Sequence, residues 1–221
     1  LLQGNPAALV IFGSQLADKT HQILEKTNIP TINVVGSPFS PAQITIETAF
    51  FEASHKLTEH LLEQGYKNIG FIGAHMDNRL QRQQLNGWHK AMLSHYQNSD
   101  LVITMPDAAS LQLGRYALNE ILLRQPELDA VICSHEEIAL GIMFECQRRL
   151  LKIPENIAVA CLDGSDNCDQ THPTLTSIRI DYKKMGIETG KLLIGLLNNN
   201  HDESEESRIV QFNYQIELRQ S

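Results

Sequence analysis

The stretch that decides the fold runs from Ala130 to Cys161 and reads AVICSHEEIALGIMFECQRRLLKIPENIAVAC. It opens with the apolar run AVIC, continues with a helical pattern from Glu136 to Leu151, and closes with the apolar run IAVAC. Neither run alternates between apolar and polar residues, which is typical of strands buried on both faces. The stretch therefore predicts two parallel strands of one sheet, joined by a helix that crosses over one face.

The same rhythm extends upstream and downstream of this stretch. Apolar runs at 68–73 and 101–103 each precede a helical pattern, at 79–96 and 110–123, and residues 176–180 follow as an extended segment. Four strand–helix units in succession indicate an α/β lobe with a mostly parallel sheet.

The two ends of the chain contain fewer elements. Residues 8–12, 31–35 and 43–46 are predicted strands, 18–27 and 48–63 helices, 181–197 an amphipathic helix, 198–207 a solvated loop and 209–218 one last, half-exposed strand. Because residues 1–48 supply too few strands for a complete sheet, we expect two α/β lobes, of which the first is truncated in this span.

Composition and charge exclude several classes of protein. The chain has 221 residues, of which 42% are hydrophobic, so it can bury a core without disulfides or metals. No apolar run approaches the roughly 18 residues that a membrane span needs. The chain has 18 Lys and Arg residues against 26 Asp and Glu residues, and its densest basic clusters are the pairs 148–149 and 183–184. Such a chain is not expected to bind DNA by itself, since binding needs several cations on one face.

Cysteines and catalytic motifs give little sign of chemistry. Cys133, Cys146, Cys161 and Cys168 form no Cys-x-x-Cys pair, so we expect reduced, mostly buried thiols and a cytoplasmic protein. There is no nucleophile elbow, phosphate loop or dinucleotide fingerprint, and the scattered histidines lack metal-ligand spacing. The sequence predicts no catalytic residue, metal or cofactor, and it favours a binding protein over an enzyme.

Polar residues follow four of the predicted strands. In open parallel sheets, ligands bind beyond the carboxyl ends of the strands, so these residues predict a cleft for a small polar ligand. The candidate ligand-binding residues are Ser14, Arg79, Arg82, His135, Glu136 and Asp163.

Each group also fits a purely structural role. Ser134 and Glu137 fit a capping box, and His135 and Glu136 fit solvated residues of a first helical turn. Asp163 before a glycine fits a turn, and the two arginines fit ion pairs with nearby acids.

Six short segments, which follow one another in order along most of the chain, resemble one known family. They are GYKNIGFIG at 65–73, NGW at 86–88, EIALG at 137–141, LKIPENIAV at 151–159, PTLTSI at 173–178 and ELRQS at 217–221. This succession resembles the LacI/GalR family of transcriptional repressors. Within it, IGAHMDNR at 72–79 and FECQR at 144–148 are most similar to gluconate-operon repressors.

The resemblance implies a periplasmic-binding-protein-like core of two Rossmann-like parallel-sheet lobes with three crossovers. The N-terminal lobe, partial here, would comprise residues 1–48 and 179–207, and the C-terminal lobe 49–178 and 208–221. It also implies a homodimer and a helix-turn-helix DNA-binding domain upstream of Leu1, absent from this span together with the first β-α-β of the N-terminal lobe. We expect no membrane partner.

The function implied by the resemblance is effector sensing by a repressor. A small sugar or sugar acid such as gluconate would bind in the inter-lobe cleft and change operator affinity, and the loops of Arg79 or Arg82, His135, Glu136 and Asp163 would contact it. Arginine would hold a carboxylate, while Glu136 and Asp163 would accept hydrogen bonds from hydroxyls. The alternative is a periplasmic sugar-binding protein of a transport system; a sugar-acid enzyme is a third class.

This chain departs from the family pattern at three places, which bear on the identity of the effector. Gln84 stands where many members have arginine, the pair His135-Glu136 stands where the family has Asn-Asp, and Leu162 replaces an aromatic residue before Asp163.

Overall fold

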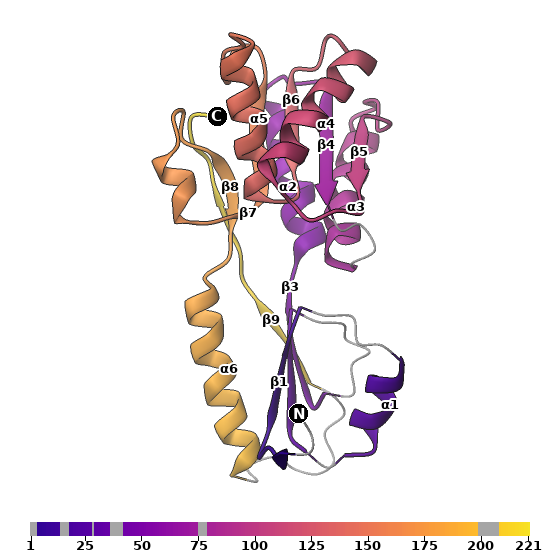
Figure 1. Ribbon diagram of the computed structural model, residues 1–221, viewed down its shortest axis with the longest axis vertical. Coiled ribbons are helices and arrows are strands. Elements are labelled where there is room, and N and C mark those ends of the chain that lie inside the picture. Colours follow the sequence, from indigo (N-terminus) through magenta and orange to yellow (C-terminus); the bar gives the residue numbers. More distant parts are fainter. Residues whose placement is uncertain (1–3, 14–17, 28, 36–41, 75–78, 199–207) are drawn as a thin grey trace. The chain divides into compact units, whose positions relative to one another are not determined.

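The computed structural model describes residues 4–13, 18–27, 29–35, 42–74, 79–198 and 208–221. The chain divides into two compact units (Figure 1). Unit 1 comprises Leu1–Ala49 and Asp181–Asn213, and unit 2 comprises Phe50–Ile180 and Tyr214–Ser221. The chain therefore passes between the units at three places, which are 49/50, 180/181 and 213/214.

Unit 2 is built on a six-stranded sheet with the order β10-β8-β7-β6-β4-β5. All neighbouring strands are parallel except β10, which pairs antiparallel with β8. The strands are β4 (Ile69–Ala74), β5 (Val102–Met105), β6 (Ala130–Cys133), β7 (Ala158–Gly164), β8 (Thr176–Arg179) and β10 (Gln215–Glu217). The predicted α/β fold with parallel sheets is confirmed.

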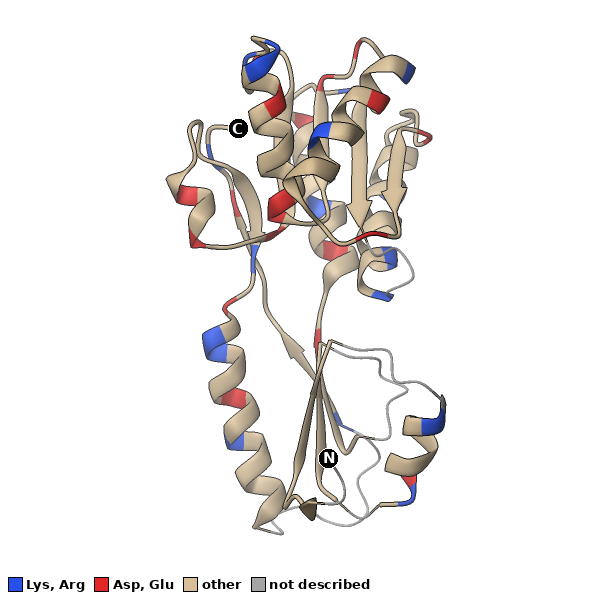
Figure 2. Cartoon of the chain, viewed as in Figure 1, with Lys and Arg blue, Asp and Glu red and all other residues tan. Residues whose placement is uncertain are grey.

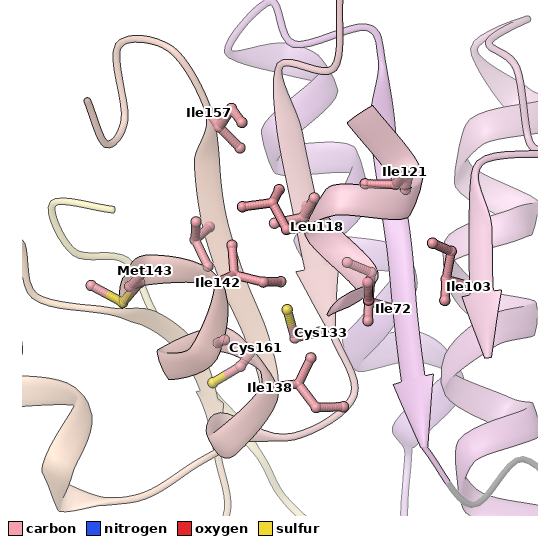
Figure 3. Packing of buried hydrophobic residues seen from close by; sticks show 14 of the residues in the cluster. Ile72, Ile103, Leu118, Ile121, Cys133, Ile138, Ile142, Met143, Ile157 and Cys161 are labelled. Carbon is pink, nitrogen blue, oxygen red and sulfur yellow. The ribbon is translucent and has the colours of Figure 1, made fainter. Parts of the chain in front are cut away.

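Two pairs of helices cover the two faces of this sheet. They are α2 (Phe50–Glu63) with α3 (Arg79–Ser94), and α4 (Leu111–Arg124) with α5 (Glu136–Arg148). Along β6, Val131 and Cys133 belong to the hydrophobic cluster that holds the residues of α4 and α5, seen from close by in Figure 3. Ala130 and Ile132 belong to the cluster on the α2 and α3 side. Burial on both faces explains why the apolar runs do not alternate.

Glycines set the spacing between α4 and α5. A Cβ atom at Gly114 would lie 2.1 Å from the carbonyl oxygen of Ile138, and one at Gly141 would lie 2.2 Å from that of Leu111. Since these close contacts are with backbone atoms, the two helices can approach this closely only where a side chain is absent. The pair therefore forms one tightly packed layer over the sheet.

Unit 1 has a smaller sheet with the order β1-β2-β3-β9, all of it parallel. Its elements are β1 (Leu9–Phe12), α1 (Asp18–Glu25), β2 (Thr31–Val34), β3 (Ile44–Thr48), α6 (Tyr182–Leu197) and β9 (Arg208–Phe212). Asp181 begins α6 by accepting a hydrogen bond from the backbone nitrogen of Lys184. Strand β1 lies at the edge of the sheet, and its Val10 and Phe12 remain 50% and 63% exposed.

The segment predicted as one last strand at 209–218 is two strands in different sheets. Residues Arg208–Phe212 form β9 and pair with β3 in unit 1, whereas Gln215–Glu217 form β10 and pair with β8 in unit 2. The assignment of all of 208–221 to the C-terminal lobe is thus corrected for 208–213. The alternating pattern continues through Asn213 without a break, so no local signal marks the change of sheet.

Acidic and basic side chains are interspersed on the helices of both units (Figure 2). Among the described residues, no helix combines the length and the apolar character that crossing a bilayer requires. All four cysteines are free and buried.

Candidate functional site

The candidate site lies at the carboxyl ends of three neighbouring parallel strands of unit 2. Strand β6 pairs with β4 on one side and with β7 on the other, so the segments that follow these strands emerge at the same edge of the sheet. Helix α3, helix α5 and the short 3-10 helix η2 (Asp166–Gln170) come after β4, β6 and β7 respectively. We call this place the carboxyl edge of unit 2.

A chain of hydrogen bonds joins the first two segments. The backbone nitrogen of Ala74, at the end of β4, donates to Ser134 Oγ at 3.2 Å. A further hydrogen bond joins Ser134 Oγ to His135 Nδ1 at 2.7 Å. The other ring nitrogen, His135 Nε2, lies 3.5 Å from Gln81 Nε2 in the first turn of α3. His135 is therefore held in place from both sides of its ring.

The predicted capping box at the start of α5 is wrong. The residue at the N-cap position is His135, which makes no side-chain capping bond, and Glu136 is the first residue of the helix. The fully buried Ser134 hydroxyl bonds instead to Ala74 and His135. Tertiary hydrogen bonds across the ends of β4 and β6 thus replace the local cap that the sequence suggested.

Glu136 joins the second segment to the third. Its carboxylate accepts hydrogen bonds from the backbone nitrogen of Ser165 at 2.6 Å, from Asn167 Nδ2 at 3.2 Å and from Cys168 Sγ at 3.5 Å. Burial alone would raise the pKa of Glu136, but these bonds together outweigh it and hold the pKa below its ordinary value. Glu136 is therefore an anion whose oxygens are engaged by η2 and the residue before it.

Asp163 lies near the end of β7, inside the strand and not in a loop after it. The pairing of β7 with β8 is regular up to Cys161, opposite Ser177, and resumes at Gly164, opposite Arg179. Two residues of β7 thus stand opposite one residue of β8, which is a β-bulge at Leu162 and Asp163. Bulges re-aim side chains, and this one sits at the half-buried Asp163 on the carboxyl edge.

The remaining predicted site residues differ in burial, and one of them lies outside the described part of the chain. Arg79 is the first residue of α3 and is half-buried, whereas Arg82 in the same turn is exposed. Ser14 lies outside the described residues. Of the six candidates, five therefore fall on unit 2, and the carboxyl edge brings together the segments that carry them.

Sequence reasoning missed two glutamines of α3. Gln81 and Gln84 are only 8% and 3% exposed, and the Oε1 atom of each is buried without a hydrogen-bond partner within the described part of the chain. Buried polar atoms are rarely left unpaired, so each such atom needs an explanation. The one signal in the sequence was Gln84 itself, at the position where many LacI/GalR members carry arginine.

The chemistry available at the carboxyl edge is that of selective hydrogen bonding. Gln81 and Gln84 offer amide groups, His135 an imidazole, and Arg79 and Arg82 guanidinium groups. Such a set can bind hydroxyls and an anionic group. Within the described residues, no three or more histidine, cysteine or acidic side chains come together as metal ligands.

The chain is similar to known proteins over most or all of its length. The family model of the periplasmic binding protein-like domain matches residues 58–221. The transcriptional regulator GntR of Escherichia coli K12 is 28% identical over 84% of this chain and 56% of its own length. The solved structure of a PurR family transcriptional regulator from Vibrio parahaemolyticus is 38% identical, with a TM-score of 0.91 over 100% of this chain and 79% of that chain.

A more distant structure shows the fold alone. A sugar-binding transcriptional regulator of the LacI family from Escherichia coli, solved with phosphate, is 22% identical, with a TM-score of 0.86 over 100% of this chain and 78% of that chain. These relatives are named as transcriptional regulators, which are not enzymes. The chain spans 56% of the length of GntR, so it corresponds to about half of that protein.

Proposed function

The chain belongs to the LacI/GalR family of transcriptional regulators, as a periplasmic-binding-protein-like domain, and from this premise we propose that it senses a small sugar or sugar acid. The effector binds at the carboxyl edge of unit 2. The observation that carries the proposal is that hydrogen bonds join the segments after β4, β6 and β7 there, while the buried Oε1 atoms of Gln81 and Gln84 have no hydrogen-bond partner among the described residues.

The polar groups at this edge suit a polyhydroxy acid. Arg79 and Arg82 supply cations for a carboxylate, and an Arg–carboxylate pair can be bidentate. The oxygens of Gln81 and Gln84 accept hydrogen bonds from hydroxyls. Because Glu136 is engaged by η2, it orders the edge and leaves the contact with hydroxyls to the glutamines and Asp163. Gluconate has both kinds of group.

A thermal-shift comparison of D-gluconate with D-glucose, on the full-length natural protein, tests the ligand class. A ligand at 100 times its dissociation constant adds about 2.7 kcal/mol to the free energy of unfolding, so gluconate raises the melting temperature and glucose does not. A shift with glucose alone contradicts the assignment of a sugar acid.

Variants then test which side chains take part. Arg79→Ala and Arg82→Ala, made together, abolish the shift with gluconate, whereas Arg124→Ala, at the end of α4, leaves it unchanged. Gln84→Leu weakens binding because it replaces the unfilled acceptor with an apolar group. If gluconate still shifts the double arginine variant fully, neither arginine holds the carboxylate.

The same family membership supports a regulatory role for the whole protein. We propose that it is cytoplasmic and binds operator DNA through a helix-turn-helix domain upstream, that units 1 and 2 are its two lobes, and that upstream sequence completes unit 1. The effector changes operator affinity by the difference between its affinities for two states, typically about 1–3 kcal/mol. Fluorescence anisotropy with labelled operator, with and without gluconate, measures that coupling; equal affinities contradict it.

A groove between α4 and α5 supports the proposal of a homodimer. It has a volume of about 380 Å³ and is lined by Leu111, Gln112, Arg115, Gly141, Phe144, Glu145 and Arg148. Leu111 and Phe144 are 46% and 51% exposed, and a second copy would cover both. The buried Glu145 carboxylate and the half-exposed arginines beside it give the groove charges of both signs, as a self-complementary surface requires.

Sedimentation of the full-length protein tests this surface. Phe144→Asp yields a monomer, whereas Tyr116→Asp, equally exposed on α4 but outside the groove, leaves the dimer intact. A Phe144→Asp variant that still sediments as a dimer places the interface elsewhere.

A further inference from the structure

The short helix η2 is held from the side of the candidate site by one carboxylate. Ser165, Asn167 and Cys168 all donate to Glu136, the first residue of α5. Three donors within four consecutive residues thus depend on a single acceptor. Whatever moves η2 must also move these donors, and with them the anchor of Glu136 at the carboxyl edge.

A second set of contacts holds η2 through arginines. Arg219 Nε donates to Asp169 Oδ1 at 2.6 Å, and Arg179 forms an ion pair with Asp166. Arg219 is 90% buried, with only 10% of its side chain exposed. A buried guanidinium with several acceptors is held much more firmly than an exposed ion pair.

Arg219 itself is fixed by the end of the chain. Its Nη1 donates to the carbonyl oxygen of Leu175 at 2.7 Å and to Ser177 Oγ at 2.8 Å, and its Nη2 pairs with Glu217. Two residues later, Ser221 Oγ donates to the carbonyl oxygen of Val159 at 2.6 Å. The C-terminal tail therefore lies along β7 and β8 as a fixed support for η2.

The same cluster of charges adjoins two of the three crossings. Arg179 ends β8, directly before the crossing at 180/181, and Glu217 ends β10, shortly after the crossing at 213/214. Arg179 Nη1 lies 3.6 Å from Glu217 Oε1, so one ion pair links the two strands. Strand β8 thus contacts η2 directly through Arg179, and β10 is linked to η2 through the pairs of Glu217 with Arg179 and Arg219, next to the places where the chain leaves or enters unit 2.

We propose that Arg219 is a positioning residue that couples these two crossings to the candidate site. It holds η2 against the strands β8 and β10, and η2 in turn holds Glu136 at the carboxyl edge. A displacement of either crossing strand changes the support of η2 and hence the geometry of the edge. The inference rests on the proposed function only in taking that edge as the effector site.

Local hydrogen exchange in the full-length protein tests the coupling without any ligand. Arg219→Gln removes the cation, and we expect backbone amides of 165–170 and of the first turn of α5 to exchange about tenfold faster. The amides of β6 keep their protection. Arg208→Gln, an exposed arginine of β9, serves as the matched control and changes neither segment.

Hydrogen exchange in Arg219→Gln would differ if Arg219 only stabilised unit 2 as a whole. If Arg219→Gln speeds exchange equally throughout unit 2, or leaves 165–170 unchanged, the proposal is overturned. Glu136→Gln provides a second readout: because both residues act on η2, the double variant exchanges at 165–170 little faster than the faster single variant. Additive effects would show that the two residues act independently.

Gluconate binding distinguishes this proposal from the proposed function. If the protein does not bind gluconate but Arg219→Gln still speeds hydrogen exchange at η2, the positioning role is supported and only the assigned ligand is contradicted. Where gluconate binds, we expect Arg219→Gln to weaken it and Arg208→Gln to leave it unchanged; unchanged binding in both variants overturns the coupling to the site.

Discussion

Unit 2 and unit 1 are both parallel α/β units, yet they bury their sheets to different degrees. In unit 2, every residue of β4 and β6 is buried, between helix pairs on both faces. In unit 1, the edge strand β1 alternates between half-buried and exposed residues. A groove of about 420 Å³, lined mainly by apolar residues of β1 and α6, lies beside it.

The central strands of unit 2 are thus fully buried, whereas the edge strand of unit 1 keeps apolar surface exposed. At the candidate site, the hydrogen bonds from Ala74 to Ser134 and from Ser165 to Glu136 each have donor and acceptor in unit 2. Unit 1 leaves Val10 and Phe12 partly in contact with water, where burial would stabilise it further. We therefore expect substitutions in unit 2 to lower the free energy of unfolding more than comparable substitutions in unit 1.

The largest expected effect is the loss of a core side chain in unit 2. Ile132→Ala lowers the free energy of unfolding by about 2–5 kcal/mol, because the side chain is fully buried and leaves a cavity. Val10→Ala in the exposed edge strand costs less than about 1 kcal/mol. Urea unfolding followed by circular dichroism measures both variants, and the fluorescence of Trp88, the single tryptophan, reports on unit 2. Similar losses for both variants would remove the contrast between the units.

Glycine substitutions give the next largest contrast. Gly141→Ala places a Cβ atom 2.2 Å from a backbone oxygen of α4, so the helices must separate at a cost of about 1–3 kcal/mol. In Gly195→Ala, in α6, the added Cβ atom meets no heavy atom within 4 Å. The free energy of unfolding therefore rises by up to about 1 kcal/mol from helix propensity. Calorimetric melting of both variants checks the signs, and a stabilised Gly141→Ala contradicts the close packing of α4 on α5.

The pH dependence of unit 2 is expected to reflect its buried carboxylates. The hydrogen bond from Arg149, helped by the charges of Arg148 and Arg115, holds the pKa of Glu145 below its ordinary value of 4.5. The folded state therefore binds this proton less tightly than the unfolded state does. The stabilisation is present above pH 4.5 and is lost as the pH falls through the lower folded-state pKa.

Glu145→Gln tests this sign. It lowers the free energy of unfolding by about 1–2 kcal/mol at neutral pH and makes the profile between neutral and acidic pH shallower. Glu63→Gln, an exposed residue at the end of α2, serves as the control and leaves the profile unchanged. A Glu145→Gln profile as steep as that of the natural protein would show that another group causes the acid loss.

The smallest effects concern single ion pairs. Arg149→Ala removes a 3.0 Å hydrogen bond to the buried Glu145 carboxylate and costs about 1 kcal/mol. Lys191→Ala removes an exposed pair with Glu188 in α6 of unit 1 and costs less than about 0.5 kcal/mol. Unfolding midpoints in low and high salt separate the two, because salt screens the exposed pair more. Equal costs would show that burial of the acceptor does not matter here.

Much of the fold could be predicted from local pattern. The apolar runs at β4, β6 and β7 and the helical periodicities between them each depend on neighbours within a few residues, so the sequence alone identified them. The positions of Arg79, His135 and Glu136 after these strands followed from the same pattern, whereas Asp163 lies inside β7 and not after it. The bulge at Leu162 and Asp163 did not, because it depends on pairing with β8.

The contacts of the candidate site were much less predictable. Ser134 has the sequence signature of a cap, but its hydroxyl bonds to Ala74, which lies 60 positions away. Glu136 looked like a ligand contact or a solvated first-turn residue, and its partners lie 29–32 residues downstream. Gln81 and Gln84 carried no local signal of burial, since glutamine in a helix is ordinarily exposed.

The sequence alone thus determined the order of the strands and helices, the burial of the main sheet on both faces and the family. These features depend on periodicity and on short motifs. Only the tertiary structure decided that residues 208–217 divide between two sheets and that Glu136 and Arg219 both bind η2. Hydrogen bonds and strand pairs select partners by position in space, and distant segments are brought together only when the chain folds.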